Sequence, residues 1–247
     1  MAAQTRATPA AARRRQARPL YRNRILRQLP AAVERRLRPA LEQIEMQPGD
    51  SLYEQNQTSK YVFFPETGMA AIVTILKDGT ETEVASVGNE GMIGMPSYMG
   101  VHTAPRRAFW RMEGRAWRMD AARFKAETRG GGPLTEAMRR YAHAMFTHLA
   151  QLATCNWHHT IKQRFCCWLL LTHDRMEGDH FDVTHEFLAQ RLGVRRAGIT
   201  VILGSLQAAG AIEHRRGRLI IRNRRKLENL ACECYGIVRR EFDRLMG

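Results

Sequence analysis

The stretch "LAQRLGVRRAGITVILGSLQAAGAI", Leu188 to Ile212, decides the fold of the C-terminal half of this chain. It contains two short segments with apolar residues at helical spacing, one on each side of Gly193. A helix-turn-helix requires an apolar and then a small residue where its second helix crosses the first, and Leu188 and Ala189 meet that requirement. The turn requires a residue that tolerates a positive φ, and Gly193 supplies it directly after Leu192.

The second segment completes the same pattern. Val194 is expected to close the turn from the inside, while Ile199 and Ile202, spaced i and i+3, are expected to anchor the second helix to the core. Residues 198–202 are weak helix formers, so this helix depends on packing more than on propensity. These positions predict a helix-turn-helix, with an ordinary helical hairpin as the alternative.

A basic hairpin follows the second helix. The run "AIEHRRGRLIIRN" reads as two short strands around a turn at Arg216-Gly217. A β-hairpin in this place is the wing that a winged helix-turn-helix adds, and it favours DNA binding over the plain hairpin. Its arginines are expected to contact backbone phosphates, which position a protein without specifying sequence; they are Arg215, Arg216 and Arg218.

The first turns of the second helix are expected to enter the major groove. An arginine can pair with guanine through two hydrogen bonds, a threonine can contact a base or a phosphate, and a valine can contact a thymine methyl. For either arginine, a phosphate contact without base readout is the alternative. The candidate DNA-binding residues on this helix are Arg195, Arg196, Ala197, Thr200 and Val201.

The charge balance agrees with a polyanionic partner. The 247 residues include 39 Lys and Arg against 24 Asp and Glu, a net charge of +15, which favours nucleic acid first and an anionic membrane second. No apolar run is long enough for a transmembrane helix. Five cysteines, at 155, 166, 167, 232 and 234, are an odd number, and we interpret them as reduced thiols of a cytoplasmic protein.

The N-terminal half has a different texture. Residues 1–24 hold seven arginines and no acid, which predicts a disordered basic arm. Residues 25–41 have helical spacing, with Pro30 opening the main helix and Pro39 near its end. After them come short β-prone runs, "AAIVTIL", "ETEVASV" and "AFWRM", with Asp78-Gly79 as a hairpin turn. Residues 25–132 are therefore predicted to form an antiparallel β-roll or jelly roll.

A long helix is predicted after "RGGGP", over residues 133–156. The broad apolar face of this helix suggests that it packs on the roll and on a partner helix at once. Packing inside one subunit is the alternative. The remaining residues, 157–247, are predicted to form the winged helix-turn-helix domain, with Thr184 capping a helix and a final helix over 226–246. The seam of the long helix consists of Leu134, Met138, Tyr141, Met145, His148 and Leu152, widened by Ala142, Leu149 and Ala153.

A β-roll, a long helix and a winged helix-turn-helix, in that order, give an α+β chain that resembles the Crp/Fnr family of bacterial transcription regulators. The resemblance covers roughly residues 25–225 and is most specific in "THEFLAQRLGVRRAGITVILGSLQAAGAIEHRRGRLII". It implies a homodimer joined through the long helix, a pseudo-palindromic double-stranded DNA site, contact with RNA polymerase, and a roll that senses a small effector.

The effector cassette departs from the cyclic-nucleotide-binding relatives. It corresponds to "GMIGMPSYMGVHTAPRRAF", with the candidate pocket residues Gly91, Gly94, Met95, Arg106 and Arg107. Met95 follows Gly94 where the resemblance implies a ribose-binding acid, and Ala108 replaces the hydroxyl residue after Arg107. A cyclic phosphate and its ribose need those groups, so a cyclic nucleotide is not expected and the effector stays unidentified.

The recognition helix departs from the family as well. The relatives often have Arg-Glu followed four residues later by another Arg, where this chain has Arg196, Ala197 and Val201. The acid that would accept a hydrogen bond from cytosine is missing. The sequence therefore predicts an operator that differs from that of the cyclic-AMP receptor type.

No metal or cofactor is predicted. The oxygen-sensing branch of the family holds an iron–sulfur cluster with mainly N-terminal cysteines, and here none precedes Cys155. Soft ligands that could bind a metal occur at Cys155, His158, His159, Cys166 and His173, but buried thiols and polar histidines are commoner. Cys232 and Cys234, two apart on an expected helix, would face different directions. Nothing favours a haem on His102, His143 or His148.

Two other classes of function compete with a DNA-binding regulator. One is a small-molecule sensor whose basic C-terminal half binds a protein partner; the helix-turn-helix positions and the basic wing argue against it. The other is an enzyme, for which the sequence offers no HExxH, GxSxG or P-loop motif. We do not expect enzymatic activity.

Overall fold

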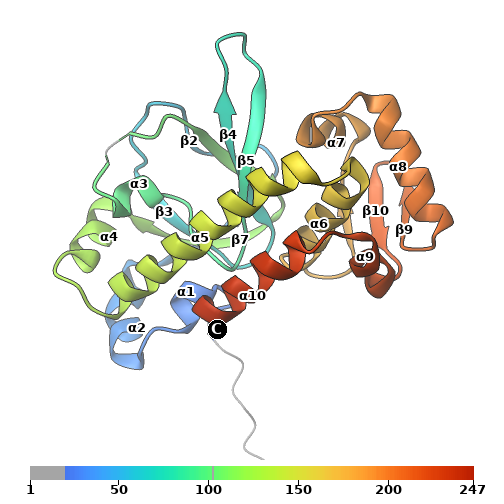
Figure 1. The fold of residues 1–247 in the computed structure, drawn as a ribbon. Coiled ribbons are helices and arrows are strands. Elements are labelled where there is room, and N and C mark those ends of the chain that lie inside the picture. Colours follow the sequence, from blue (N-terminus) through green and yellow to red (C-terminus); the bar gives the residue numbers. More distant parts are fainter. Residues whose placement is uncertain (1–19, 102) are drawn as a thin grey trace, which may run out of the picture.

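The computed structural model describes residues 20–101 and 103–247. Figure 1 shows a β-roll at one end, a long central helix beside it, and a smaller helical and β unit at the other end. This arrangement confirms the predicted α+β fold with roll, central helix and winged helix-turn-helix. Within the described residues, no helix combines the length and apolarity that a membrane crossing needs.

The roll consists of two antiparallel sheets. The predicted run "ETEVASV" is β5, and the predicted hairpin forms because the Thr80 amide donates to Asp78 Oδ1 (2.9 Å) and Gly79 adopts a φ of 85°. One sheet has the order β1-β7-β3, with β1 at Glu42–Met46, β7 at Gly114–Asp120 and β3 at Tyr61–Pro65. The other has the order β2-β6-β4-β5, with β2 at Ser51–Tyr53, β6 at Arg107–Met112, β4 at Met69–Ile75 and β5 at Glu81–Val87.

Short helices pack against the roll and α5. Pro30 is the N-cap of α2, as predicted, but the helical segment is divided into α1, α2 and a 3₁₀ turn. The prediction of a disordered arm over residues 1–24 is wrong for its last residues, because Tyr21 and Asn23 are buried and Asn23 caps α1. The rest of the predicted arm, residues 1–19, lies outside the described ranges. The helices are α1 at Arg24–Arg27, α2 at Ala31–Leu37, the 3₁₀ turn at Arg38–Ala40, α3 at Met95–Tyr98 and α4 at Ala121–Thr128.

The central helix α5 spans Pro133–His158. Three glycines before it, at 130 to 132, all have positive φ, which explains the "RGGGP" run. The predicted seam faces inward: Leu134, Met138, Tyr141 and His148 are buried, and Met145 and Leu152 are half-buried. A second apolar face points outward, with Phe146 72% and Trp157 87% exposed.

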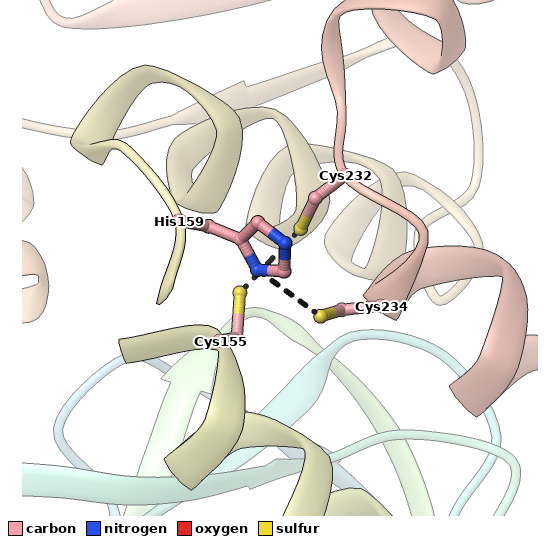
Figure 2. Close-up of side chains that lie close together, drawn as sticks. All are labelled: Cys155, His159, Cys232 and Cys234. Carbon is pink, nitrogen blue, oxygen red and sulfur yellow. Dashed lines mark hydrogen bonds between the residues drawn. The ribbon is translucent and has the colours of Figure 1, made fainter. Parts of the chain in front are cut away.

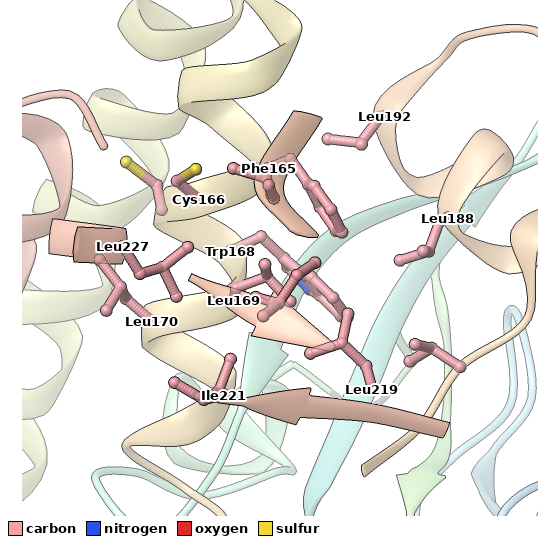
Figure 3. Close-up of a cluster of buried hydrophobic side chains, with 14 of the residues drawn as sticks. Phe165, Cys166, Trp168, Leu169, Leu170, Leu188, Leu192, Leu219, Ile221 and Leu227 are labelled. Atoms are coloured by element: carbon pink, nitrogen blue, oxygen red, sulfur yellow. The ribbon is translucent and has the colours of Figure 1, made fainter. Parts of the chain in front are cut away.

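The C-terminal unit is built around one hydrophobic core (Figure 3). Helix α6 supplies Phe165, Trp168 and Leu169 to it, and the wing supplies Leu219 and Ile221. An unexpected strand, β8, adds to the wing and gives the order β8-β10-β9. The elements are α6 at Ile161–His173, β8 at His180–Asp182, α7 at His185–Leu192, α8 at Arg196–Ala208, β9 at Ile212–Arg215, β10 at Arg218–Ile221, α9 at Arg224–Leu230 and α10 at Cys234–Met246.

The last helix returns to the roll. The predicted helix over 226–246 is broken at residues 231–233, because α9 ends at Leu230 and α10 starts a new direction. In Figure 1 α10, drawn in red, lies beside α5 and ends next to α1. Arg24 Nη1 donates to Asp243 Oδ1 (2.7 Å), and Phe242 joins the core that contains the residues of α1. The C-terminal helix therefore connects the two ends of the molecule.

Candidate nucleic-acid interface

The turn of the helix-turn-helix forms as its residues predicted. The Phe187 amide donates to Thr184 Oγ1 (3.1 Å), so Thr184 caps α7. Gly193 ends α7 with a φ of 66° and a ψ of 40°, a left-handed conformation that favours glycine. The Val194 amide then donates to the Ala189 carbonyl (3.0 Å), which closes the turn. Helix α8 begins at Arg196.

Helix α8 is held by a buried stripe on its inner side. Ile199 is fully buried, as predicted, whereas Ile202 is only half-buried. Leu203 and Leu206 take the larger share of the packing, and the prediction missed them. They follow Ile199 at i+4 and i+7, so the same helical period would have found them.

The outer side of α8 carries the predicted DNA-binding residues. Arg195, Arg196, Ala197, Thr200 and Val201 are all exposed, and Val201 is 72% exposed. In the described part of the chain, no carboxylate lies within ion-pair distance of either arginine. Exposed guanidinium groups without an acidic partner are available for phosphate or base contacts.

Two stacked imidazoles support the start of α8. The His185 and His214 ring centroids lie 5.1 Å apart, and Thr200 Oγ1 is 3.4 Å from His185 Nδ1. Burial lowers the pKa of His185, and the nearby His214 and Arg196 lower it further. Thr200 therefore contacts α7 in addition to facing solvent.

The wing arginines differ in their surroundings. Arg216 and Gly217 form the tip of the hairpin with φ of 52° and 81°. Arg218 Nε lies 3.1 Å from Asp182 Oδ1, so part of its charge is neutralised. For Arg215 and Arg216 no such carboxylate partner is found among the described residues. The three wing arginines, which the sequence analysis assigned the same role, therefore differ in whether a carboxylate neutralises their charge.

Two family models match the chain, the first over the roll and the second over the helix-turn-helix. The model of the cyclic nucleotide-binding domain matches residues 43–129, and the model of the Crp-like helix-turn-helix domain matches residues 163–230. Together they cover more than half of the 247 residues. The chain belongs to the Crp/Fnr family. It is a Crp/Fnr-like transcription regulator with a helix-turn-helix DNA-binding domain.

Several solved structures share this fold at low identity. FixK2 from Bradyrhizobium japonicum has a TM-score of 0.65 at 15% identity, covering 78% of this chain and 98% of its own. A CRP-family transcriptional regulator from Thermus thermophilus has a TM-score of 0.63 at 15% identity, covering 77% and 96%. The c-di-GMP responsive regulator CLP from Xanthomonas campestris has 0.56 at 15%, covering 78% and 100%. No curated protein gives a significant match.

The predicted effector pocket of this Crp/Fnr protein is tightly filled. Arg107 Nε and Nη1 lie 3.3 Å from Glu54 and 3.0 Å from Glu81, so its charge is already balanced, and Arg106 is exposed. A Cβ at Gly91 would meet the Tyr141 ring at 2.2 Å. The cavity beside Gly94 is about 10 Å³, the size of about one water molecule. The five pocket residues therefore stay a prediction.

Buried ion pairs hold the DNA-binding domain of this Crp/Fnr protein against the roll. Arg175, which follows α6, has Nη2 2.7 Å from Glu90 Oε1, and both side chains are almost fully buried. Arg191 of α7 has Nε 3.2 Å from the buried Glu83 of β5. Burial raises the pKa of Glu90, but the Arg175 charge and the Gly88 amide outweigh it, so the net pKa is lowered and the pair is charged.

The histidines considered for haem lie in different settings. His143 is exposed, with Nε2 3.3 Å from Glu241 Oε1. His148 is buried under the roll, and burial, with a further contribution from Arg175, lowers its pKa to about 4. His148 is therefore neutral at physiological pH. His102 lies outside the described residues.

The cysteine predictions need correction. Cys232 precedes α10 instead of lying on a helix with Cys234, and the bend brings both thiols to one place. There they meet Cys155 and His159 from the end of α5 (Figure 2). His158 is exposed, Cys166 faces the core, and His173 Nε2 contacts Asp179 Oδ1 at 2.8 Å. The sequence missed this convergence because Cys155 and Cys232 are 77 residues apart.

Proposed function

We propose that the protein is a homodimeric, sequence-specific transcription regulator that reads a pseudo-palindromic double-stranded DNA site through α8. The observation that carries this proposal is the division of α8 into a buried side and an exposed side bearing Arg195 and Arg196. Ala197 and Val201 on the same side offer apolar contacts that suit thymine methyl groups. The wing tip at Arg216 would hold the adjacent phosphates.

The outward face of α5 supports a dimer. Phe146, Leu149, Ala150, Ala153 and Trp157 form one exposed stripe at i, i+3, i+4, i+7 and i+11. A helix of 26 residues is about 39 Å long, enough for a continuous helix–helix seam. A second copy of the same chain brings the same stripe, which makes a two-fold interface self-complementary.

The remaining features of the proposal follow from this function. The two recognition helices should meet half-sites about 10 base pairs apart, or a multiple of that. We further propose that the protein acts in the cytoplasm and contacts RNA polymerase, as a bacterial transcription regulator would. We divide the chain into a roll at 25–132, a dimerisation helix at 133–156 and a DNA-binding unit at 157–247. A genomic pull-down that enriched no inverted repeat would contradict the proposal.

Arg196→Ala should weaken binding to the specific site by about 1–3 kcal/mol and relax the preference at one base of each half-site. The reason is the loss of a bidentate contact to a base edge. Fluorescence anisotropy on a panel of single-base operator variants measures both effects. Arg35→Ala, which removes an exposed charge on α2 at the far end of the molecule, is the control. Equal losses on specific and random DNA would show a phosphate contact alone.

Arg216→Ala should leave base preference unchanged and reduce the salt dependence of binding. Each neutralised phosphate contributes about 0.9 to the slope of log K against log salt, so the slope should fall by about that amount per subunit. Titrations of one operator at several salt concentrations give the slope, with Arg35→Ala again as the charge-matched control. A slope equal to that of the wild type would exclude Arg216 from the interface.

A further inference from the structure

Four potential metal ligands converge where α5, α6 and α10 meet. Cys155 lies in the last turn of α5 and His159 directly follows it, while Cys232 lies on the bend before α10 and Cys234 is the first residue of α10. In Figure 2 their side chains point toward one another from two segments that are far apart in sequence. The three thiol sulfurs and one imidazole nitrogen all lie within 4.8 Å of one another. All three cysteines are buried and reduced.

The distances within the group suit a small tetrahedral ion. Cys155 Sγ and Cys232 Sγ are 3.5 Å apart, and Cys234 Sγ is 3.5 Å from His159 Nδ1. Zinc binds sulfur at about 2.3 Å and imidazole nitrogen at about 2.0 Å. A tetrahedron with those bonds has edges of about 3.8 Å between sulfurs and about 3.5 Å between sulfur and nitrogen. These two distances lie within a few tenths of an ångström of the ideal edges, and since all four ligand atoms lie within 4.8 Å of one another, movements of up to about 1 Å would complete the site.

Neighbouring side chains already orient the ligands. His159 Nε2 lies 3.3 Å from Glu233 Oε2, so a proton on Nε2 would leave Nδ1 as the lone-pair donor toward the three sulfurs. A carboxylate behind a histidine ligand is the usual outer partner of a metal-bound imidazole. Gln151 Nε2 lies 3.1 Å from Cys234 Sγ and can donate to a thiolate there. Both contacts favour the ligand forms that a metal requires.

We propose that Cys155, His159, Cys232 and Cys234 bind one structural Zn²⁺ ion. Three thiolates and one imidazole complete a four-coordinate set and leave no position for substrate, which is the pattern of structural zinc sites. Binding releases the three thiol protons to solvent, so the ion with its ligands carries a net charge of −1. The site joins the end of the central helix to the start of α10. It is separate from α8 and from the roll pocket, so it does not depend on the proposed DNA binding.

The two other cysteines, Cys166 and Cys167, are not part of the proposed metal site. Cys167 Sγ lies 3.2 Å from Cys232 Sγ on the α6 side, outside the group of four, where it can donate a hydrogen bond to the Cys232 sulfur. Cys166 is buried in the core of the DNA-binding domain and is not one of the four gathered residues. Cys166→Ala is therefore a matched control, because it removes a buried thiol from the neighbouring helix α6 without removing a ligand.

The first experiment uses the unmodified full chain, purified under reducing conditions without chelator. Elemental analysis and native mass spectrometry should find one zinc per chain, whether or not DNA is bound. After removal by a chelator, Co²⁺ should restore one equivalent, with sulfur-to-cobalt charge transfer and the ligand-field bands of tetrahedral coordination. A chain that retains no zinc and takes up no cobalt tetrahedrally would overturn the proposal. A Cys155–Cys232 disulfide in protein that was purified with a reductant and supplied with zinc would overturn the proposal as well.

Variants then assign the ligands. Cys234→Ser and Cys232→Ser should lower the zinc content from one per chain toward zero in competition with a chelator, and Cys166→Ala should keep it at one. Glu233→Gln should retain the cobalt spectrum but weaken zinc binding by about 10–100-fold, because it alters only the partner of His159. Zinc retention by Cys232→Ser equal to that of Cys166→Ala would show that the metal binds elsewhere. If a serine variant folds poorly, removal of zinc from the wild-type chain and its replacement by Co²⁺ still decide whether the chain binds a metal tetrahedrally.

Discussion

Phe146→Glu is expected to convert the proposed dimer to a monomer and to weaken binding to a two-half-site operator by at least about 100-fold. Phe146 is 72% exposed at the middle of the outward face of α5, so a charge there would be buried against its own symmetry mate. Linked half-site binding gains about 10²–10⁴ in affinity over a single site, and a monomer loses that gain. Analytical ultracentrifugation and operator titrations measure the two effects.

The same change should leave each subunit folded. Phe146 makes no part of the buried clusters, and its replacement opens no cavity in the core. Met99→Glu, directly after α3, is the control, since Met99 is similarly exposed and lies away from the outward face of α5. If Phe146→Glu sedimented as a dimer with wild-type affinity, the outward face of α5 would not be the interface.

Glu90→Gln is expected to lower the free energy of unfolding by about 3–5 kcal/mol, since it leaves the buried Arg175 charge without a partner. Urea denaturation of the full chain at neutral pH measures this loss. The net lowering of the Glu90 pKa adds a pH signature. The pair contributes stability above the ordinary carboxyl pKa, and that contribution is lost as the pH falls through the lowered pKa of the folded protein.

Two comparisons separate this effect from a general loss of charge. Glu42→Gln breaks the pair with Arg118, which is exposed on the roll surface, and should cost less than about 1 kcal/mol. Replacing both partners, as Glu90→Leu with Arg175→Met, should recover much of the loss because no unpaired charge remains. A single Glu90→Gln effect as small as that of Glu42→Gln would mean that the pair contributes little to holding the domains together.

The helix-turn-helix was predictable because its requirements are local. Leu188, Gly193 and Ile199 lie within a dozen residues, and each has one steric reason for its identity. The exposure of Arg195 and Arg196 follows from the same helical period. The roll strands were predictable for a similar reason, since turn residues and β-prone runs alternate along the chain.

Contacts between distant segments were not predictable from these patterns. Glu90 and Arg175 are 85 residues apart, and nothing in either neighbourhood indicates the other. Cys232 could not be placed because the break at residues 231–233 contains neither Gly nor Pro. Arg107 fitted a phosphate cassette by its position, but Glu54 and Glu81 lie beside it in the fold. In all three places a partner from elsewhere in the chain decides the role of the residue.

The return of α10 to the roll gives residues 160–230 two covalent links to the rest of the molecule, in addition to the buried ion pairs that Arg175 and Arg191 make with the roll. One is the extended residue His159 after α5, and the other is the bend at residues 231–233 before α10. A rigid unit that is linked at two points can rotate about the line that joins them without stretching either link. Cys155, His159, Cys232 and Cys234 gather where both links pass. If the unit that carries α8 turned about this line, a small rotation at the junction would displace α8 by a larger distance.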